Sequence, residues 1–350
     1  MKGIKQKREP WHTLPDHFFE QSNTLRSLFA RLVNAQRPDN IAIMPSASYG
    51  LSTVAQNLPK KTSDKKIITV GEQFPSNVYP WMRYCQNSGC KMHVIEAPAE
   101  FKRRGQEWNE KILEAIDSNT LMVAIGNIHW TDGTLFNLEA IGKRARKVGA
   151  YFVIDGTQSV GALPFDVQSI QPDALICAGY KWLMGPYSIA LGYFGERFAD
   201  GIPIEEGWIE RKDSENFAGL VNYTDEYQPG ALRYDVGERS NFILVPMMIK
   251  ALQQILEWQP ANIQSYCREL TQELTKELPA LGYNIEESGQ RTHHLFGIHL
   301  PDYIKVNDLK EKLTEHNIHV SVRGSALRVS PNVFNDERDI AALREVIVNS

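Results

Sequence analysis

Two apolar runs in the middle of the chain each lead to a charged side chain. Tyr151–Ile154 delivers Asp155, and Ala174–Ala178 delivers Lys181 through a Gly179 bend. The separation of the two charged residues fits two strands with a connection between them. Because the carboxyl ends of strands in an α/β sheet open onto the ligand crevice, both side chains should point into one site. The pattern predicts an α/β fold with a polar pair at one edge of the sheet.

A carboxylate and a lysine in one site suit the chemistry of pyridoxal phosphate. Asp155 would pair with the protonated pyridine nitrogen and keep the ring an electron sink. Lys181 would form a Schiff base with the aldehyde and then move protons at the substrate's α-carbon. Charged residues at strand ends are nevertheless common in α/β proteins, and an Asp-Gly pair is mostly a turn signal. For these two residues alone, a structural role is an equal alternative.

The residues around this pair favour the catalytic interpretation. VIDGTQSVG followed by AGYKWLMGP resembles the class V aminotransferase family of fold-type I pyridoxal phosphate enzymes. That family includes cysteine desulfurases, selenocysteine lyase, kynureninase and isopenicillin N epimerase-like proteins. The resemblance covers about residues 35–345. It implies that Asp155 pairs with the pyridine nitrogen, that Gln158 lies near the phenolic oxygen O3′, and that Lys181 carries the cofactor.

Small residues before a helical pattern form a candidate phosphate site. In MPSASYGLSTVAQNL an apolar strand leads into Ala47 and Ser48 and then into a helix. Backbone N–H groups at a helix start bind phosphate, and we expect Ser48, with Ser46 as a second candidate, to add a hydroxyl. The alternative is that one of these serines only caps the helix.

The residues just before the lysine depart from the desulfurase pattern. Desulfurases have Ser-Gly-His there, whereas this chain has Ala178, Gly179 and Tyr180. Ala178 cannot donate a side-chain hydrogen bond. The resemblance to kynureninase-like members implies that the hydroxyl of Tyr180 contacts the phosphate instead.

Two aromatic segments align with the part of the family that covers the cofactor ring. In GEQFPSNVYPW, Phe74 falls where desulfurases have a histidine, and it would stack on the ring; the alternative is a core side chain. In AIGNIHWTDG the family's usual asparagine is replaced at or near Trp130. His129 beside it is a candidate contact for O3′ or the substrate, and a structural histidine is an equal alternative.

A later loop implies a dimer. RYDVGERSNF aligns with a loop that in the family crosses to the neighbouring subunit's phosphate. Glu238 replaces the usual threonine, so Arg239 and Ser240 are the candidates for this contact. A solvated loop with a local pairing of Glu238 and Arg239 is the alternative. The resemblance implies a homodimer with shared active sites.

Near the C-terminus, HVSVRGSALRVSPNVFNDERDI again resembles the family. Arg328 corresponds to the arginine that holds the substrate's α-carboxylate, for which a planar, two-pronged donor is suited. Arg323 lies beside it in sequence and receives no catalytic role. The desulfurase loop with its nucleophilic cysteine would lie between these arginines, but here it is too short and contains no cysteine.

Composition is typical of an ordinary soluble enzyme. The chain has 350 residues, 42% of them hydrophobic, which is enough for two domains with substantial cores. Its formal charge of −4 and lack of a basic patch argue against nucleic acid. The four cysteines form no CxxC pair, so we expect no metal site and a reducing cytoplasm. No apolar run approaches the roughly 18 residues of a membrane span.

Alternating strand and helix patterns suggest how the chain divides. We expect an N-terminal helical segment at residues 1–40, a large cofactor-binding α/β domain at 41–245, and a smaller α+β domain at 246–350. The sheet of the large domain should be mostly parallel. Arg328 of the small domain would then face Lys181 of the large one.

These observations leave more than one activity open. The first expectation is transamination of a small α-amino acid. The alternative is β-elimination of the C–S lyase type without a persulfide cysteine, because both reactions begin by removing the same α-proton. A non-catalytic cofactor-binding protein is a further alternative. A NAD-linked enzyme is disfavoured, since no GxGxxG motif follows a strand.

Overall fold

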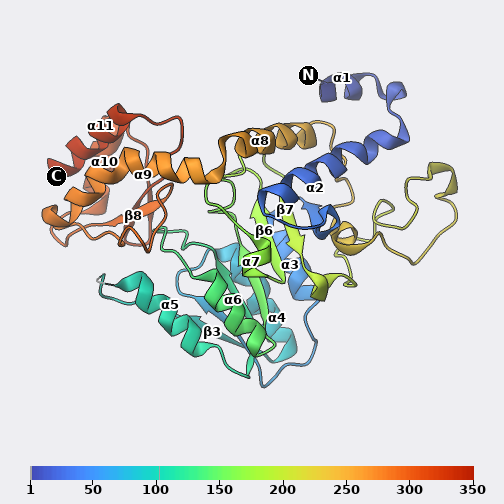
Figure 1. Ribbon diagram of the computed structural model, residues 1–350, viewed down its shortest axis with the longest axis horizontal. Coiled ribbons are helices and arrows are strands. Elements are labelled where there is room, and N and C mark those ends of the chain that lie inside the picture. The colour runs from blue at the N-terminus through green and yellow to red at the C-terminus, as the bar shows by residue number, and fades with distance from the viewer. Residues whose placement is uncertain (1, 102) are drawn as a thin grey trace.

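A seven-stranded sheet runs through the middle of the molecule, in a computed structural model that describes residues 2–101 and 103–350 (Figure 1). Its strands in chain order are β1 (Ile41–Met44), β2 (Lys66–Val70), β3 (Lys91–Ile95), β4 (Thr120–Gly126), β5 (Tyr151–Asp155), β6 (Ala174–Ala178) and β7 (Ala190–Phe194). The spatial order is β1-β7-β6-β5-β4-β2-β3. Strands β6, β5, β4, β2 and β3 run parallel to one another, whereas β7 lies between β1 and β6 and is antiparallel to both. The expected mostly parallel sheet is confirmed.

The central strands are buried on both faces, which explains their continuous apolar sequences. Successive side chains of a strand point to opposite faces. In β5, Phe152 and Ile154 therefore join the hydrophobic cluster on one side of the sheet, and Val153 joins the cluster on the other.

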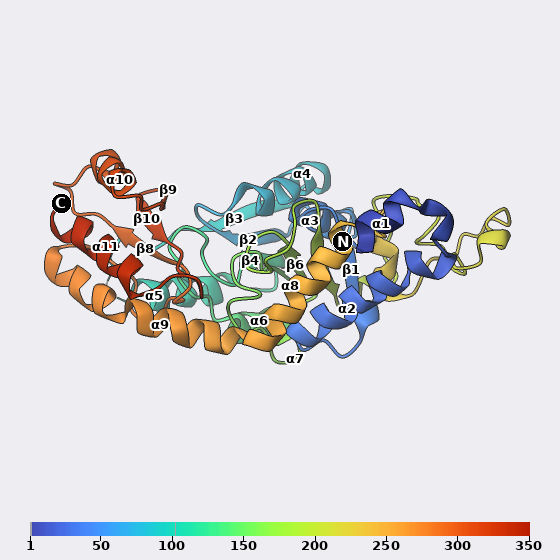
Figure 2. The ribbon, with the colours of Figure 1, turned by 90° about the horizontal axis from the view of Figure 1, so that it is seen from above.

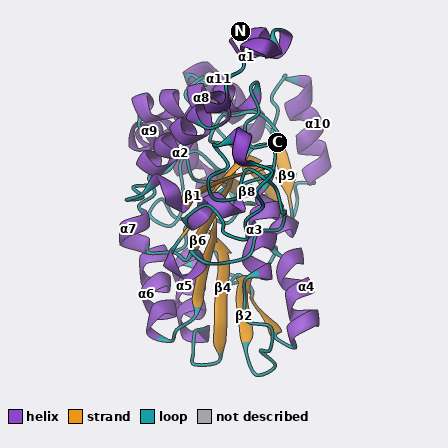
Figure 3. Cartoon of the chain, turned by 90° about the vertical axis from the view of Figure 1, so that its right-hand side faces the viewer, coloured by secondary structure: helices purple, strands orange, loops and turns teal. Residues whose placement is uncertain are grey.

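Helices lie on both faces of the sheet, as Figure 3 shows, and their apolar side chains pack against it. One layer contains α3 (Ala47–Gln56) and α4 (Tyr79–Ser88). The opposite layer contains α2 (Glu20–Leu32), α5 (Arg104–Ala115), α6 (Leu138–Lys147), α7 (Val167–Ile170) and α8 (Leu244–Trp258). The remaining N-terminal helix, α1 (Lys2–Arg8), lies at the edge of the molecule (Figure 1).

The C-terminal elements form a separate unit at one end of the elongated molecule (Figure 2). Its helices and strands are α9 (Pro260–Glu277), β8 (Phe296–His299), α10 (Val306–Glu315), β9 (Ser321–Arg323), β10 (Ala326–Val329) and α11 (Glu337–Val348). The strands make an antiparallel sheet in the order β8-β10-β9. Leu274, Phe296 and Leu327 belong to its own hydrophobic cluster. The expected α/β fold with a smaller α+β part is thus present.

The boundaries at residues 40 and 245 stay predictions, but the hydrophobic clusters show which elements share a core. Buried side chains of α2 and α8 belong to the cluster that covers the large sheet. Helix α8 ends at Trp258. The next residue, Gln259, adopts a φ of 65°, and Pro260 begins α9. No helix in the described residues is both long and apolar enough to cross a membrane.

Candidate active site

Asp155 and Lys181 come together as the sequence predicts. Asp155 is the last residue of β5, and Lys181 follows the end of the neighbouring parallel strand β6. Burial raises the pKa of Asp155, and hydrogen bonds from the side chain and the N–H of Thr157, together with the charge of Lys181, offset this only in part. The contacts of Asp155 within the protein therefore do not fully offset the cost of burying its charged form.

The amine of Lys181 lies among aromatic rings and charged groups. Its Nζ lies 5.2 Å from the ring centroid of Phe74 and 5.9 Å from that of Tyr180. Burial lowers the pKa of Lys181; the charge of Asp155 acts against this, while Arg328 and Arg323 lower the pKa further. A lowered pKa favours the neutral amine, which is the form that attacks a carbonyl.

The two sequence motifs are packed directly on one another. Gly161 has a φ of 107°, and a Cβ at this position would lie 2.2 Å from the carbonyl oxygen of Trp182. Trp182 donates from Nε1 to Oε1 of Gln158 at 3.1 Å, and His294 donates from Nε2 to the Gln158 carbonyl at 2.8 Å. Burial lowers the pKa of His294 to about 4, so this histidine is neutral. Both ends of Gln158 are thereby fixed beside the Lys181 loop.

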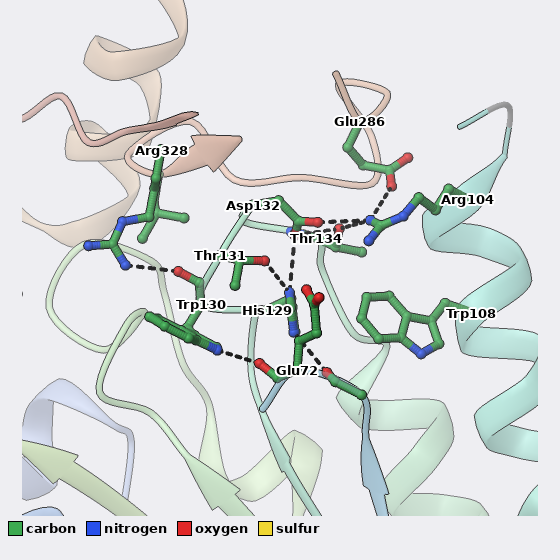
Figure 4. Close-up of polar contacts among 12 residues, drawn as sticks. Glu72, Arg104, Trp108, His129, Trp130, Thr131, Asp132, Thr134, Glu286 and Arg328 are labelled. Atoms are coloured by element: carbon green, nitrogen blue, oxygen red, sulfur yellow. Dashed lines mark hydrogen bonds and ion pairs between the residues drawn. The ribbon is translucent and has the colours of Figure 1, made fainter. Parts of the chain in front are cut away.

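Phe74 and Trp130 form an aromatic wall near the lysine. Their rings meet edge to face with centroids 5.3 Å apart. Trp130 donates from Nε1 to the carbonyl of Glu72 at 2.6 Å, which fixes its indole (Figure 4). Phe74 is half-buried next to Lys181, as expected for a residue that covers the cofactor; its stacking role stays a prediction.

Arg328 reaches this region from the small C-terminal sheet. It lies in β10 and donates from Nη1 to the carbonyl of Trp130 at 2.9 Å (Figure 4). Its Nε is buried without a hydrogen-bond partner. Burial, with a contribution from Arg323, lowers the pKa of Arg328 to about 10. A guanidinium with unused donors therefore lies close enough to affect Lys181.

His129 is held within the protein by both ring nitrogens. Nε2 lies 3.1 Å from the carbonyl of Gly71, and Nδ1 lies 2.7 Å from Oγ1 of Thr131. Since a carbonyl can only accept, Nε2 carries the proton. The ring also packs at 5.0 Å from Trp108. The structure thus gives His129 the contacts of a structural histidine and leaves it no free nitrogen.

Above His129 in the view of Figure 4, a buried ionic cluster joins the loop after β4 to α5 and to the segment before β8. Asp132 lies 2.9 Å from Nη1 of Arg104, which in turn lies 3.7 Å from Glu286. Burial alone would raise the pKa of Asp132, but His129, His299 and Arg104 hold it well below its usual range. The described residues contain no group of three or more His, Cys, Asp or Glu side chains arranged to hold a metal.

The candidate phosphate contacts occupy a helix start and a loop. Ser46 caps α3 by accepting from the N–H of Tyr49 at 3.1 Å, and Oγ of the exposed Ser48 lies 2.9 Å from Oγ of Ser46. Ala47 is the first residue of the helix. Tyr180 is 36% exposed and stacks on another tyrosine ring at 3.9 Å. Phosphate binding by these residues stays a prediction.

Arg239 and Ser240, the candidates for a contact with a neighbouring subunit, both make contacts within their own chain. Arg239 is 3% exposed, and its Nε lies 2.8 Å from Asp235 of the same chain. Ser240 donates to the carbonyl of Phe18. Within one chain the Arg239 guanidinium is therefore buried beside Asp235, with Nε and Nη1 making no hydrogen bond. Its contact with a neighbouring subunit's phosphate stays a prediction.

The sequence did not identify several residues that contact or influence the site. Trp182 and His294 fix Gln158, and Arg323 acts electrostatically on Lys181. His294 is far from Gln158 in sequence and belongs to no motif, so no local signal marks it. Arg323 and Trp130 are visible in the motifs, but their proximity depends on how the small sheet docks.

Comparisons with known proteins identify the family of the chain. A family model described as aminotransferase class V matches residues 5–340. A probable cysteine desulfurase of Pyrococcus abyssi is 31% identical over 191 residues, which cover 54% of this chain and 46% of that protein. An uncharacterized aminotransferase of Bacillus subtilis, YcbU, is 22% identical over 327 residues, which cover 92% of this chain and 81% of that protein. The chain thus spans about half the length of the desulfurase that it matches.

Solved structures share the fold along nearly the whole chain. An apo cysteine desulfurase from Thermococcus onnurineus NA1 has a TM-score of 0.81 at 21% identity, covering 97% of this chain and 85% of that one. A C-DES mutant with glycine covalently linked to its PLP cofactor has a TM-score of 0.84 at 18% identity, covering 99% and 90%. The family model spans most of the sequence, and so the chain belongs to the class V aminotransferase family of pyridoxal phosphate enzymes.

Proposed function

We propose that this protein is an aminotransferase that uses pyridoxal phosphate on a small α-amino acid. The observation that carries the proposal is the convergence of separate elements on one amine. The pKa of Lys181 responds to Asp155 at the end of β5 and to Arg328 in β10. Phe74, from the loop after β2, lies 5.2 Å from the same Nζ.

The residues around Lys181 fit this cofactor. Burial raises the pKa of Asp155, and the chain compensates for it only in part. A protonated ring nitrogen is the kind of partner that would keep this carboxylate ionised. The Phe74 ring beside Lys181 offers an apolar face for a planar ring, and the exposed start of α3 offers backbone N–H groups for a phosphate.

Each residue then has a definable task. When bound, pyridoxal phosphate supplies an aldehyde for covalent attachment and a ring that accepts electrons from the α-carbon. Lys181 holds it covalently and carries a proton to and from the α-carbon of the substrate. Arg328 binds the α-carboxylate and so orients the amino acid. Phe74 and Trp130 restrict water at the reacting atoms.

The chain offers no cysteine to a reaction that ends in a persulfide. All four cysteines are buried, and burial raises the pKa of Cys177 and Cys267. The desulfurase names among the relatives therefore do not transfer directly, while the aminotransferase name belongs to a relative that is matched over most of this chain. β-Elimination remains the competing outcome in the test below.

Spectroscopy and product analysis test the proposal together. Borohydride reduction of the purified holoenzyme should attach the cofactor to Lys181, located by peptide mass spectrometry. Lys181→Ala should abolish this attachment, whereas the exposed, paired Lys212→Ala should retain it. With an amino acid and a keto-acid acceptor, we expect a new keto acid in equal amount to the new amino acid. Ammonia released without consumption of acceptor would assign the enzyme to elimination. A reduced cofactor on any other lysine would overturn the site.

A homodimer and a cytoplasmic location stay predictions. Sedimentation velocity of the holoenzyme, across a range of concentrations, tests the first. Full activity in a species that sediments as a monomer would show that the active site is complete within one chain.

A further inference from the structure

We propose that Arg323 and Arg328 form a paired anion site, so that the substrate is an α-amino acid with an acidic side chain, of the aspartate and glutamate class. Arg328 would bind the α-carboxylate and Arg323 the side-chain carboxylate. This inference rests on the proposed function, because it concerns the substrate of the same site.

The strand register places both arginines on one face of the C-terminal hairpin. Arg323 of β9 lies directly opposite Ala326 of β10. Residues directly opposite each other in an antiparallel pair point to the same side, and so do residues two apart along a strand. Arg328 is two residues beyond Ala326 and therefore shares the face of Arg323. Such diagonal neighbours have backbones about 7–8 Å apart, within reach of long side chains.

Both guanidinium groups converge on one aromatic ring. The central carbon of Arg323 lies 5.7 Å from the ring centroid of Trp130, and that of Arg328 lies 5.9 Å from it. Both charges also lower the pKa of Lys181. Two cations therefore lie close to Trp130 and act on Lys181; Figure 4 shows Arg328 beside Trp130.

The two arginines use few of their N–H groups in hydrogen bonds within the protein. Arg328 donates to the Trp130 carbonyl and keeps a buried, unpartnered Nε. Arg323 donates from Nη1 to the carbonyl of its neighbour Val322 at 2.8 Å. Glu72 lies near the hairpin turn, since a Cβ on Gly324 would be 3.2 Å from its Oε2. Within the described residues, however, neither arginine forms an ion pair with a carboxylate.

An excess of positive charge beside a lysine calls for anionic ligands. Two guanidiniums repel one another, as the lowered pKa of Arg328 reflects in part. One planar fork suffices for an α-carboxylate. The second fork then matches a second carboxylate, which a simple aliphatic amino acid lacks.

Calorimetry with unreactive acids tests this pairing in the holoenzyme. The probes are propionate, succinate and glutarate, which have no amino group to react. We expect succinate or glutarate to bind at least about tenfold more tightly than propionate, as one additional charge-assisted contact implies. Arg323→Gln should remove this advantage and leave propionate binding unchanged, while Arg328→Gln should weaken all three. Arg338→Gln, at an exposed arginine on α11, controls for net charge.

The outcomes separate this inference from the proposed function. Equal affinity of the unaltered enzyme for the three acids would overturn the paired site. Equal weakening of propionate and the dicarboxylates by Arg323→Gln would also overturn it, because both arginines would then hold one carboxylate. Borohydride attachment at Lys181 is measured on the same preparations. Its failure would reject the proposed function itself, whereas successful attachment without dicarboxylate preference would reject only the acidic substrate.

Discussion

Arg328 donates from Nη1 to the main-chain carbonyl of Trp130 at 2.9 Å. This bond ties β10 of the small sheet to the loop that follows β4 of the large one. The N–H of Gly297 donates to the carbonyl of Asp132 at 2.9 Å and fastens the same loop a second time. A backbone carbonyl orients Arg328 without neutralising it, so its charge remains available to a ligand.

Removing the Arg328 fork should therefore impair substrate binding. In Arg328→Ala we expect KM for the preferred amino acid to rise roughly 30-fold or more, since loss of one buried charge pair costs about 2–5 kcal/mol. The absorption band of the bound cofactor should be unchanged. Steady-state kinetics and the visible spectrum, measured on one preparation, check both parts.

Arg328→Lys provides the matched control, because it keeps the charge but removes the planar fork. We expect it to recover little of the lost binding. Unchanged activity of Arg328→Ala on every accepted amino acid would mean that the carboxylate is held elsewhere, with Arg323 and Arg233 as the next candidates.

Asp155→Asn should separate attachment of the cofactor from catalysis. The amide retains the shape of the side chain but cannot balance a ring cation, so kcat should fall by about 10²–10³ or more, the range for loss of a preorganised electrostatic partner. Lys181 should remain reducible by borohydride. Asp166→Asn is a suitable control because Asp166 only caps the short helix α7, and asparagine caps equally well. Normal turnover in Asp155→Asn would exclude the ring-nitrogen role.

The sequence could predict those parts of the site whose position depends only on neighbouring residues in the chain. Asp155 and Lys181 end or follow apolar runs, and strand direction alone brings such positions to one edge of a parallel sheet. Outside the site, α11 likewise begins at a local signal, the Asp336 cap. In each case, neighbours in the chain determine the structure.

What the sequence left open depends on contacts between distant segments. A histidine next to a strand end can face a ligand or the core, and only the fold shows that Gly71 and Thr131 occupy His129. Arg239 lies in a loop with a family-like sequence, yet Asp235 and the N-terminal helices bury it. Pairing of such groups is decided by packing that no local pattern encodes.

The cysteines should be dispensable for turnover. Each is buried, and we expect Cys→Ala changes at the four positions to leave kcat/KM nearly unchanged. A hydrogen bond with Cys85 lowers the pKa of Cys90 to about 7, which makes Cys90 the most demanding case. Mass spectrometry after incubation with cysteine should find no persulfide. Lost turnover with retained cofactor in any one variant would place a thiol in the mechanism.

Asp235 should be important for stability because it balances two buried arginines. It pairs with Arg26 and Arg239 and also accepts from the N–H of Ile43 at 2.8 Å. Asp235→Asn removes the carboxylate that pairs with both guanidiniums and should cost about 3–5 kcal/mol of unfolding free energy in urea.

Arg239→Met is the variant to compare with Asp235→Asn. It keeps the pair of Arg26 and Asp235 and places an apolar side chain against Phe19. We expect a smaller loss of stability and unchanged affinity for pyridoxal phosphate. Weakened cofactor binding at unchanged stability would instead support the predicted role of Arg239 at a neighbouring subunit's phosphate.

Glu210 should make stability depend on pH in the direction opposite to that of most carboxylates. It is 1% exposed, and both its carboxylate oxygens are buried without a hydrogen-bond partner. Burial, with Asp235 and Glu205 adding to it and Arg239 opposing it, raises the pKa of Glu210 from 4.5 to about 7. The folded state thus retains a proton that the unfolded chain releases. Its contribution to stability is complete below pH 4.5 and is lost as the pH rises to about 7, by up to about 3 kcal/mol.

Glu210→Gln cannot ionise and should remove this pH dependence. Urea unfolding between pH 5 and 8 should show that the variant and the unaltered protein differ little at the acid end, and that the variant becomes the more stable one as the pH rises. Glu257→Gln, on the exposed side of α8, should leave the pH profile as it was. If the profiles of Glu210→Gln and the unaltered protein run parallel across this range, Glu210 is ionised in the folded protein throughout and its burial is compensated by Arg239.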